Sequence, residues 1–238
     1  MAIAFISDLH LEPIENSRLK TFYNLLSRAN DDFDALYIIG DLFEYWIGDD
    51  DEHPVNRNII QHIKKSTDNG LGIFLMHGNR DFLLGSKFEE MTGAKIIDDM
   101  TIIEDEFCKI MVSHGDVFCT DDIEYQKLKK TLRSDEWIKS FLSKTIEERI
   151  IFANQLRSQS AESSSNKAES IMDVNLDYVD EVIEKNNLDI LIHGHTHRPA
   201  IHKLDSGASR AVLGSWENNE GWIIEYKQGN IDLKSFPL

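Results

Sequence analysis

The sequence predicts an α/β protein built as a layered sandwich. In the first half of the chain, apolar runs of strand length alternate with amphipathic helical segments, in the order βαβαβα. In the last quarter the runs read almost entirely as strands, and this order is typical of a layered sandwich. The 238 residues are 41% hydrophobic, which is an ordinary share for a chain that buries a sizeable core.

The first half contains strands that end at Ile6, Ile39 and Met76, each with polar residues directly after it. Between them, apolar residues from Leu19 to Ala29 mark one helical face, and a second helix is expected over residues 55–68. The further elements expected here are a short helix at 86–93 and strands at 94–97, 101–104 and 109–113.

The second half begins with a change of pattern. Residues 121–170 read as helical or irregular without a strand, and the Ser-rich stretch 158–170 is expected to be a flexible connection. We therefore expect a core formed by residues 1–120 and 171–238, with a helical insertion at 121–170. The elements expected after the insertion are a helix at 175–185 and strands at 190–192, 200–204, 211–215, 222–227 and 231–236.

Composition excludes several classes of protein. The net charge of −17 argues against non-specific binding of nucleic acid, which needs a basic surface. Two cysteines, Cys108 and Cys119, make no disulfide framework and favour a reducing compartment such as the cytoplasm. The N-terminal apolar run breaks at Asp8, which indicates a strand and not a signal peptide. The acidic run Asp49–Glu52 is expected to be a solvated loop, rather than an additional cation site.

Five expected strand ends carry side chains that bind metal ions. Because the carboxyl ends of parallel strands form the ligand-binding edge of α/β sheets, these side chains are expected to converge. Carboxylate, imidazole and amide donors without thiolates suit hard or borderline divalent ions such as Mn, Fe or Zn. The pattern predicts a two-metal centre with its ions ~3.5–4 Å apart. The candidate ligands are Asp8, His10, Asp41, Asn79, His114, His195 and His197.

These residues stand in the motifs D-L-H (8–10), G-D (40–41), G-N (78–79), H-G (114–115) and G-H-T-H (194–197). In this order the motifs resemble the signature of calcineurin-like metallophosphoesterases. Longer stretches extend the likeness to one branch of that superfamily, the bacterial UDP-2,3-diacylglucosamine diphosphatases, over nearly the whole chain. These stretches are residues 40–50, 77–85, 114–122, 171–175 and 192–199.

The resemblance implies an αββα sandwich with a helical insertion and two divalent ions, most often Mn²⁺. Asp41 would bridge both ions. Asp8, His10 and His197 would complete the first site, and Asn79, His114 and His195 the second. The implied reaction, a step of lipid A biosynthesis, is attack of a metal-activated water on the α-phosphorus of UDP-2,3-diacylglucosamine. It releases UMP and 2,3-diacylglucosamine 1-phosphate, known as lipid X.

The resemblance also implies roles for side chains that touch the substrate. Asp41, Arg80 and His195 are the expected catalytic residues, and Arg80 replaces the histidine of phosphoprotein phosphatases. An arginine binds phosphate oxygens through two parallel hydrogen bonds, although a salt bridge to Asp81 or to the acidic loop is the alternative. Ser164 stands where the family commonly has Asn, so either Ser164 or Asn166 could make that contact. The full set of expected substrate contacts is Asn79, Arg80, Asp122, Ser160, Lys167 and His195.

The insertion carries an amphipathic stripe and a local surplus of basic residues. Residues 123–157 hold eight Lys and Arg against five Asp and Glu, in a chain that is otherwise acidic. We expect one face of these helices to hold acyl chains and another to contact the anionic cytoplasmic surface of the inner membrane. The alternative is a pair of ordinary helices packed on the core. The stripe is formed by Trp137, Ile138, Phe141, Leu142, Thr145, Ile146, Arg149, Ile150, Phe152 and Ala153.

Two other functions remain open at this point. The metal centre could act on a soluble nucleotide as a phosphodiesterase or pyrophosphatase, although a soluble substrate needs no apolar insertion. The fold could also serve as a binding module without catalysis, although such a module would be expected to lack several ligands. No protein partner is indicated by the sequence.

Overall fold

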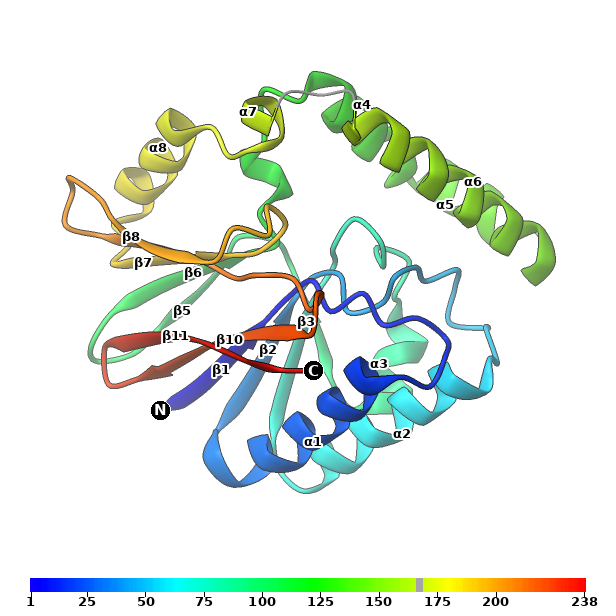
Figure 1. Ribbon diagram of the computed structural model, residues 1–238, viewed down its shortest axis with the longest axis horizontal. Helices are drawn as coiled ribbons and strands as arrows, with labels where there is room; N and C mark the ends of the chain where they lie inside the picture. The colour runs from blue at the N-terminus through cyan, green and yellow to red at the C-terminus, as the bar shows by residue number, and fades with distance from the viewer. Residues whose placement is uncertain (166–168) are drawn as a thin grey trace.

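Two β-sheets pack face to face in the computed structural model, which describes the backbone of residues 1–165 and 169–238 and the side chains of 1–159 and 171–238 (Figure 1). The first sheet has the strand order β11-β10-β1-β2-β3-β4, and the second has the order β5-β6-β7-β9-β8. Helices cover the outer face of each sheet, so the expected αββα sandwich is confirmed.

The first sheet is parallel in its centre and antiparallel at one edge. Strands β1 to β4 run parallel, while β10 and β11 pair antiparallel beside β1. All five residues of β2 are buried, as expected for a central strand covered on both faces. The bounds are β1 Ala2–Ile6, β2 Ala35–Ile39, β3 Gly72–Met76, β4 Lys95–Ile97, β10 Glu220–Lys227 and β11 Asn230–Pro237.

The outer face of the first sheet is covered by α1 (Ser17–Asp32), α2 (Pro54–Asp68) and α3 (Ser86–Thr92). The apolar face that runs from Leu19 to Ala29 on α1 is buried against the sheet. Helix α3 was expected from the sequence. The residue that caps its first turn, Asp49, is far away in the chain. The Asp49 carboxylate accepts from the backbone N–H groups of Gly85 and Phe88.

The second sheet has the parallel strands β6, β7 and β9 between two antiparallel edge strands. Helix α8 (Leu176–Asn186) packs on its outer face through Val179, Val182 and Ile183. The bounds are β5 Thr101–Glu104, β6 Lys109–Ser113, β7 Ile190–His193, β8 Ala200–Lys203 and β9 Ser209–Val212. Strand β9 ends before the expected 211–215, because the chain leaves the sheet at Leu213 to approach the loop after β1.

The inner faces of the two sheets share an aromatic and aliphatic core. Tyr37 on β2 stacks between Phe5 on β1 and Phe74 on β3, with ring centroids 5.4 and 4.6 Å apart. Residues of β6, β7 and β9 close this core from the other side. The packing fixes the position of one sheet relative to the other, so that the carboxyl ends of β1, β2, β3, β6 and β7 meet at one edge.

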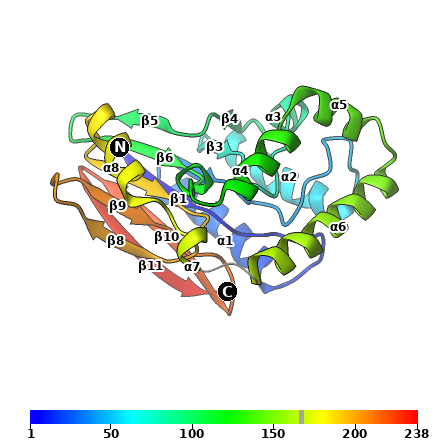
Figure 2. The ribbon, with the colours of Figure 1, turned by 90° about the horizontal axis from the view of Figure 1, so that it is seen from above.

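Helices within residues 123–165 and 169–172 lie above that edge (Figures 1 and 2). They are α4 (Ile123–Leu132), α5 (Asp135–Leu142), α6 (Ile146–Ser165) and α7 (Glu169–Met172), with a 3₁₀ turn η1 (Asp116–Phe118) before them. The expectation of a flexible connection from residue 158 is wrong up to Ser165, because α6 continues through this polar stretch. The division into a core and an insertion at 121–170 stays a prediction.

Arg149 fastens α6 to the core. It is 4% exposed, and its guanidinium forms two hydrogen bonds with Asp50, at 2.6 and 2.9 Å. It also donates to the backbone carbonyls of Ile47 and Leu142. Arg149 is therefore not part of an open amphipathic stripe.

The acidic run Asp49–Glu52 is not only a solvated loop, as was expected, because two of its residues bind the helices. Asp49 caps α3, and Asp50 binds Arg149. None of the described helices is long and apolar enough to cross a membrane.

We predict that Arg149→Ala lowers the free energy of unfolding by about 2–4 kcal/mol, because it leaves buried carbonyl groups without a donor. Urea denaturation followed by circular dichroism measures the change. Asp50→Asn serves as the control and is expected to cost about 1 kcal/mol or less, because that side chain is 54% exposed. Equal effects of the two variants would contradict this account.

Candidate active site

The loops after the strands turn sharply, with several candidate ligands in the left-handed backbone region. The φ angles are +54° for Asp8, +47° for His10, +54° for Asp41, +65° for His195 and +55° for His197. Residues other than glycine rarely adopt such angles, and those that do cluster at functional sites. The backbone at this edge is thus bent to turn side chains of successive loops toward one another.

The first group of donors consists of Asp8, His10 and His197, whose candidate ligand atoms all lie within 4.8 Å of one another. Asp8 is fully buried, and its Oδ1 lies 3.2 Å from Nε2 of His197. Its Oδ2 accepts hydrogen bonds from the hydroxyl of Ser7 at 2.6 Å and from the backbone N–H of His195 at 2.9 Å. One carboxylate oxygen is therefore held by the protein, and the other faces the histidines.

The second group is built around Asn79. Its Oδ1 lies 3.1 Å from Nε2 of His114 and 3.1 Å from Nδ1 of His195. His114 is fully buried, and its Nδ1 lies 3.1 Å from the carbonyl oxygen of Ile39. A proton on Nδ1 bonded to that carbonyl leaves Nε2 as the nitrogen that faces Asn79 and Asp41 and that a bound cation would take.

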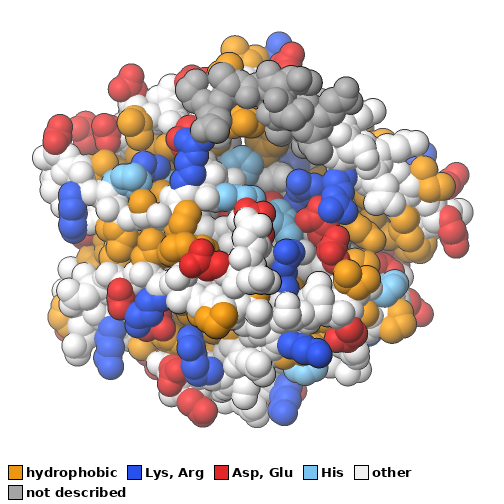
Figure 3. Space-filling view, in the orientation of Figure 1, with side chains coloured by type: hydrophobic (Ala, Val, Ile, Leu, Met, Phe, Trp, Pro, Cys, Tyr) orange, Lys and Arg blue, Asp and Glu red, His pale blue; other side chains and the backbone are white. Residues whose placement is uncertain are grey.

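Asp41 lies between the two groups. Its Oδ2 is 4.0 Å from Nε2 of His10 and 3.9 Å from Nε2 of His114, so one oxygen faces both sets of donors. Its Oδ1 accepts a hydrogen bond from the backbone N–H of Arg80 at 2.8 Å. The structure thus brings all seven predicted ligands together at one edge, and Figure 3 shows histidine side chains gathered near the centre of this face.

Glycines make this crowding possible. A Cβ atom on Gly78 would lie 2.0 Å from Oδ1 of Asp41, and one on Gly194 would lie 2.3 Å from Oδ2 of Asp8. On Gly40, which has a φ of +99°, it would lie 2.2 Å from Nδ1 of His114. The glycines of the G-D, G-N and G-H-T-H motifs are therefore required by close contact with the ligands themselves.

Burial and mutual charge shift the ionisation of these groups. Burial raises the pKa of Asp41 to about 6, although His114 and His10 oppose this shift. For Asp8, burial also acts upward, but the hydrogen bond and charge of His197 keep its pKa well below the ordinary range. Burial would lower the pKa of His114, yet the carboxylates of Asp41 and Asp116 outweigh it and raise that pKa to about 9. Burial and the nearby His114 lower the pKa of His195 to about 3.

These donors fit two divalent cations. Asp8, Asp41 and His114 form a second cluster within 4.8 Å, which shares Asp8 with the first cluster. Two buried carboxylates placed this close repel each other, and a bound cation removes the repulsion. The first set would consist of Asp8, His10 and His197, the second of Asn79, His114 and His195, with Asp41 available to both.

The side chain of Arg80 does not bind Asp81 or the acidic loop, which were the alternatives for it. Asp81 is fully buried and accepts from the backbone N–H groups of Gly78 and Leu42, both at 2.8 Å, so it ties the loop after β3 to the loop after β2. Arg80 instead places its Nη1 3.5 Å from Oε1 of Glu44, at the edge of the adjoining pocket.

Sequence reasoning missed two buried carboxylates beside the ligands. Glu44 contacts His10 and Arg80. Asp116 accepts hydrogen bonds from the hydroxyl of Tyr125 at 2.6 Å and from Lys129 at 2.8 Å, which joins α4 to the loop after β6. Asp116 and Glu44 stand in the stretches 114–122 and 40–50 that carry the family resemblance, so both positions were usable signals.

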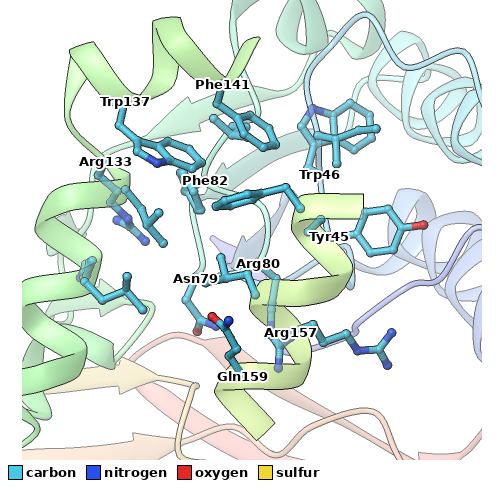
Figure 4. A pocket seen from close by; sticks show the side chains of 18 of the residues that line it. Tyr45, Trp46, Asn79, Arg80, Phe82, Arg133, Trp137, Phe141, Arg157 and Gln159 are labelled. Carbon is cyan, nitrogen blue, oxygen red and sulfur yellow. The ribbon is translucent and has the colours of Figure 1, made fainter. Parts of the chain in front are cut away.

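A cavity of about 320 Å³ opens beside Asn79 and Arg80, between the core and helices α4, α5 and α6. Figure 4 shows the aromatic rings of Trp46, Phe82, Trp137 and Phe141 on one side of it and the polar groups of Asn79, Arg80 and Gln159 on the other. Trp137 stacks on Phe141 with ring centroids 4.8 Å apart. The other apolar lining residues are Tyr45, Ile47, Leu83, Leu128, Leu132, Phe152, Ala153 and Leu156.

The expected substrate contacts are only partly described. Asn79, Arg80 and Asp122 line the cavity, and Asp122 also caps α4 by accepting from the backbone N–H of Tyr125. His195 lies beside it, with its ring centroid 5.8 Å from that of Tyr125. The side chains of Ser160, Ser164, Asn166 and Lys167 lie outside the described residues.

The fold and the donor set are those of a metal-dependent phosphoesterase. The sequence pattern of calcineurin-like phosphoesterases matches residues 1–199, and this chain belongs to that family. A solved archaeal phosphodiesterase has the same fold, with a TM-score of 0.53 at 15% identity over the full length of both chains.

More similar relatives carry a specific name. The chain is 40% identical to the UDP-2,3-diacylglucosamine hydrolase of Marinobacter nauticus over 241 residues, which cover 100% of this chain and 99% of the relative. It is also 40% identical to the protein of the same name from Escherichia coli O7:K1, over 242 residues and 100% of both chains.

We predict that Gly78→Ala weakens binding of divalent cations by roughly 10–100-fold, because the added methyl displaces Asp41. Titration of metal-free protein with Mn²⁺ measures the affinity. Gly72→Ala, on the preceding strand β3, is the matched control, since its nearest contact would be an ordinary 3.4 Å. Wild-type affinity in Gly78→Ala would show that this close approach is not required.

Proposed function

We propose that this protein hydrolyses UDP-2,3-diacylglucosamine to UMP and 2,3-diacylglucosamine 1-phosphate. The observation that carries the proposal is the full-length identity of 40% to hydrolases of that name, joined to an apolar cavity that is lined by Asn79, one of the seven ligands. The class of reaction is metal-dependent hydrolysis of a phosphoric anhydride in the synthesis of lipid A.

The seven ligands would hold two divalent cations, which when bound would supply a water molecule that is nucleophilic at neutral pH and would neutralise charge on the phosphate under attack. The oxygen of that water adds to the α-phosphorus, and the anhydride bond to the β-phosphate breaks. UMP keeps the new oxygen, and the sugar phosphate leaves with the former bridging oxygen. We infer that Mn²⁺ is the physiological ion, in keeping with the Asp, Asn and His donors.

The side chains of the protein orient this reaction. Asp41, Asn79 and His195 hold the reacting centre, and Arg80 supports the charge that develops on the diphosphate. Arg80 is well placed for this role because its backbone N–H binds Asp41 while its side chain reaches the cavity. Asp122, Ser160 and Lys167 are proposed to bind the sugar and its phosphate.

The apolar side of the cavity favours a lipid over a soluble nucleotide. Trp46, Phe82, Trp137 and Phe141 line one side of the cavity, and acyl chains are stabilised by burial against such rings. A binding module without catalysis is disfavoured because the full set of seven ligands is present and converges.

We also propose that the insertion contacts the anionic cytoplasmic face of the inner membrane. Lys127 and Lys130 of α4 are exposed, and Leu128 between them is 43% exposed. Ile151 of α6 is 58% exposed. Basic and apolar groups side by side suit a membrane surface. Lys129 and Arg149 cannot serve this purpose, because they bind Asp116 and Asp50.

Hydrolysis in ¹⁸O-labelled water tests the reaction. We expect the label in UMP and not in the sugar phosphate, since attack at the α-phosphorus leaves the new oxygen on the uridine side. Activity is expected to disappear after chelation and to return with Mn²⁺. A soluble phosphodiester assayed in parallel is expected to be a poor substrate. If it is turned over readily while the lipid is untouched, the soluble-nucleotide function is favoured.

For the membrane surface, we predict that Lys127→Glu combined with Lys130→Glu reduces sedimentation with vesicles rich in anionic phospholipid. Each basic residue near such a surface is worth about 1 kcal/mol. Turnover of detergent-dispersed substrate is expected to stay at the wild-type rate. Lys20→Glu with Lys65→Glu, on α1 and α2 at the opposite side of the molecule, is the control. Equal vesicle binding by both double variants would contradict the proposed membrane contact through Lys127 and Lys130.

A further inference from the structure

Glu44 lies in the loop after β2 and is 8% exposed. Its two carboxylate oxygens contact three different side chains. Oε2 lies 3.1 Å from Nδ1 of His10, while Oε1 lies 2.7 Å from Nε of Arg157 and 3.5 Å from Nη1 of Arg80. A single buried carboxylate therefore joins a candidate metal ligand, the arginine proposed to bind the diphosphate and a residue of α6.

The contact with His10 acts on the metal centre. The two ring nitrogens of a histidine differ in role, and the partner of one nitrogen decides which of them is free to bind a cation. Nδ1 of His10 is buried and lies 3.1 Å from Oε2 of Glu44 without a formed hydrogen bond, whereas Nε2 faces Oδ2 of Asp41 at 4.0 Å. The negative charge of a carboxylate this close favours the proton on Nδ1, which keeps the Nε2 lone pair available and increases its basicity.

The contacts with the arginines act on the cavity. Arg80 and Arg157 come from separate parts of the chain, the loop after β3 and helix α6, and both line the cavity together with Glu44. Their side chains are long, and pairing with the same carboxylate oxygen restricts them to one place. Both arginines are thereby tied to one carboxylate at the wall of the cavity that Asn79 also lines, and a diphosphate bound there would need positive charge.

We propose that Glu44 is a positioning residue of this site: it keeps His10 in the tautomer whose Nε2 binds a cation, and it holds Arg80 and Arg157 in place for the diphosphate. This inference rests on the proposed function. Through these contacts, Glu44 would couple the metal centre to the helices that cover the cavity.

The test is titration of metal-free protein with Mn²⁺, followed by calorimetry or by the electron paramagnetic resonance of free Mn²⁺. Wild type is expected to bind two ions. In Glu44→Ala one of the two sites should weaken roughly 10–100-fold while the other stays unchanged. Glu44→Asp, which keeps the charge but withdraws it from His10, should show the same loss and remains informative if Glu44→Ala does not fold.

Two further variants separate the roles. Glu44→Gln retains an acceptor for Nδ1–H of His10 but has no charge for the arginines. Its Mn²⁺ affinity should therefore fall less than in Glu44→Ala, while KM for the lipid substrate rises roughly 5–10-fold. Glu12→Gln is the matched control, because Glu12 also lies near Arg157, at 3.7 Å, and makes no ion pair with His10 or Arg80 among the described residues. It should behave as wild type in both measurements.

Wild-type binding of both Mn²⁺ ions by Glu44→Ala and Glu44→Asp would overturn the role toward His10. An unchanged KM in Glu44→Gln would overturn the role toward the arginines. Failure of the wild-type protein itself to bind Mn²⁺ would instead contradict the proposed metal centre, so the two failures are distinguishable.

Discussion

Two carboxylates, Asp8 and Asp41, are buried close together where the two sheets meet. The groups around them are arranged to compensate their negative charge. Asp8 is fully buried and Asp41 is 2% exposed. Burial of two such groups is strongly unfavourable unless hydrogen bonds and positive charge compensate it. The surrounding histidines, the backbone N–H of Arg80 and the hydroxyl of Ser7 provide part of that compensation. A pair of divalent cations would supply the remainder, which explains why so many donors converge here.

The backbone of the loops is shaped by the same requirement. Five of the seven candidate ligands occupy left-handed conformations, which non-glycine residues avoid when nothing constrains them. Glycines stand where a side chain would strike a ligand, as Gly78 does against Asp41. Asp81, which takes no part in the donor set, fixes two of the loops by accepting from their backbone N–H groups. The strands form a rigid base for this arrangement, and the unfavourable backbone angles lie in the loops.

The helices above the site are connected to it by charge and not by apolar packing alone. Asp116 holds α4 through Tyr125 and Lys129, Glu44 contacts Arg157 of α6, and Asp50 binds Arg149 of the same helix. Each contact joins one of these helices to a loop that follows a strand. The cavity enclosed in this way is apolar along one side and polar at the ligands, which suits a substrate with acyl chains at one end and a diphosphate at the other.

Local signals in the sequence determined the strands, most of the helices, the layered fold and the seven residues that converge. An apolar run of strand length followed by Asp, Asn or His carries this information within a few residues, and the parallel order of the strands brings those ends to one edge. Only the tertiary structure decided what Glu44, Asp116 and Arg149 do, since their partners are distant in sequence, as Arg149 is from Asp50. It also decided that the Ser-rich stretch to Ser165 is helical and that the acidic loop holds α3 and α6. Composition cannot reveal these outcomes, because the free energy of a charged side chain depends on which groups share its buried surroundings.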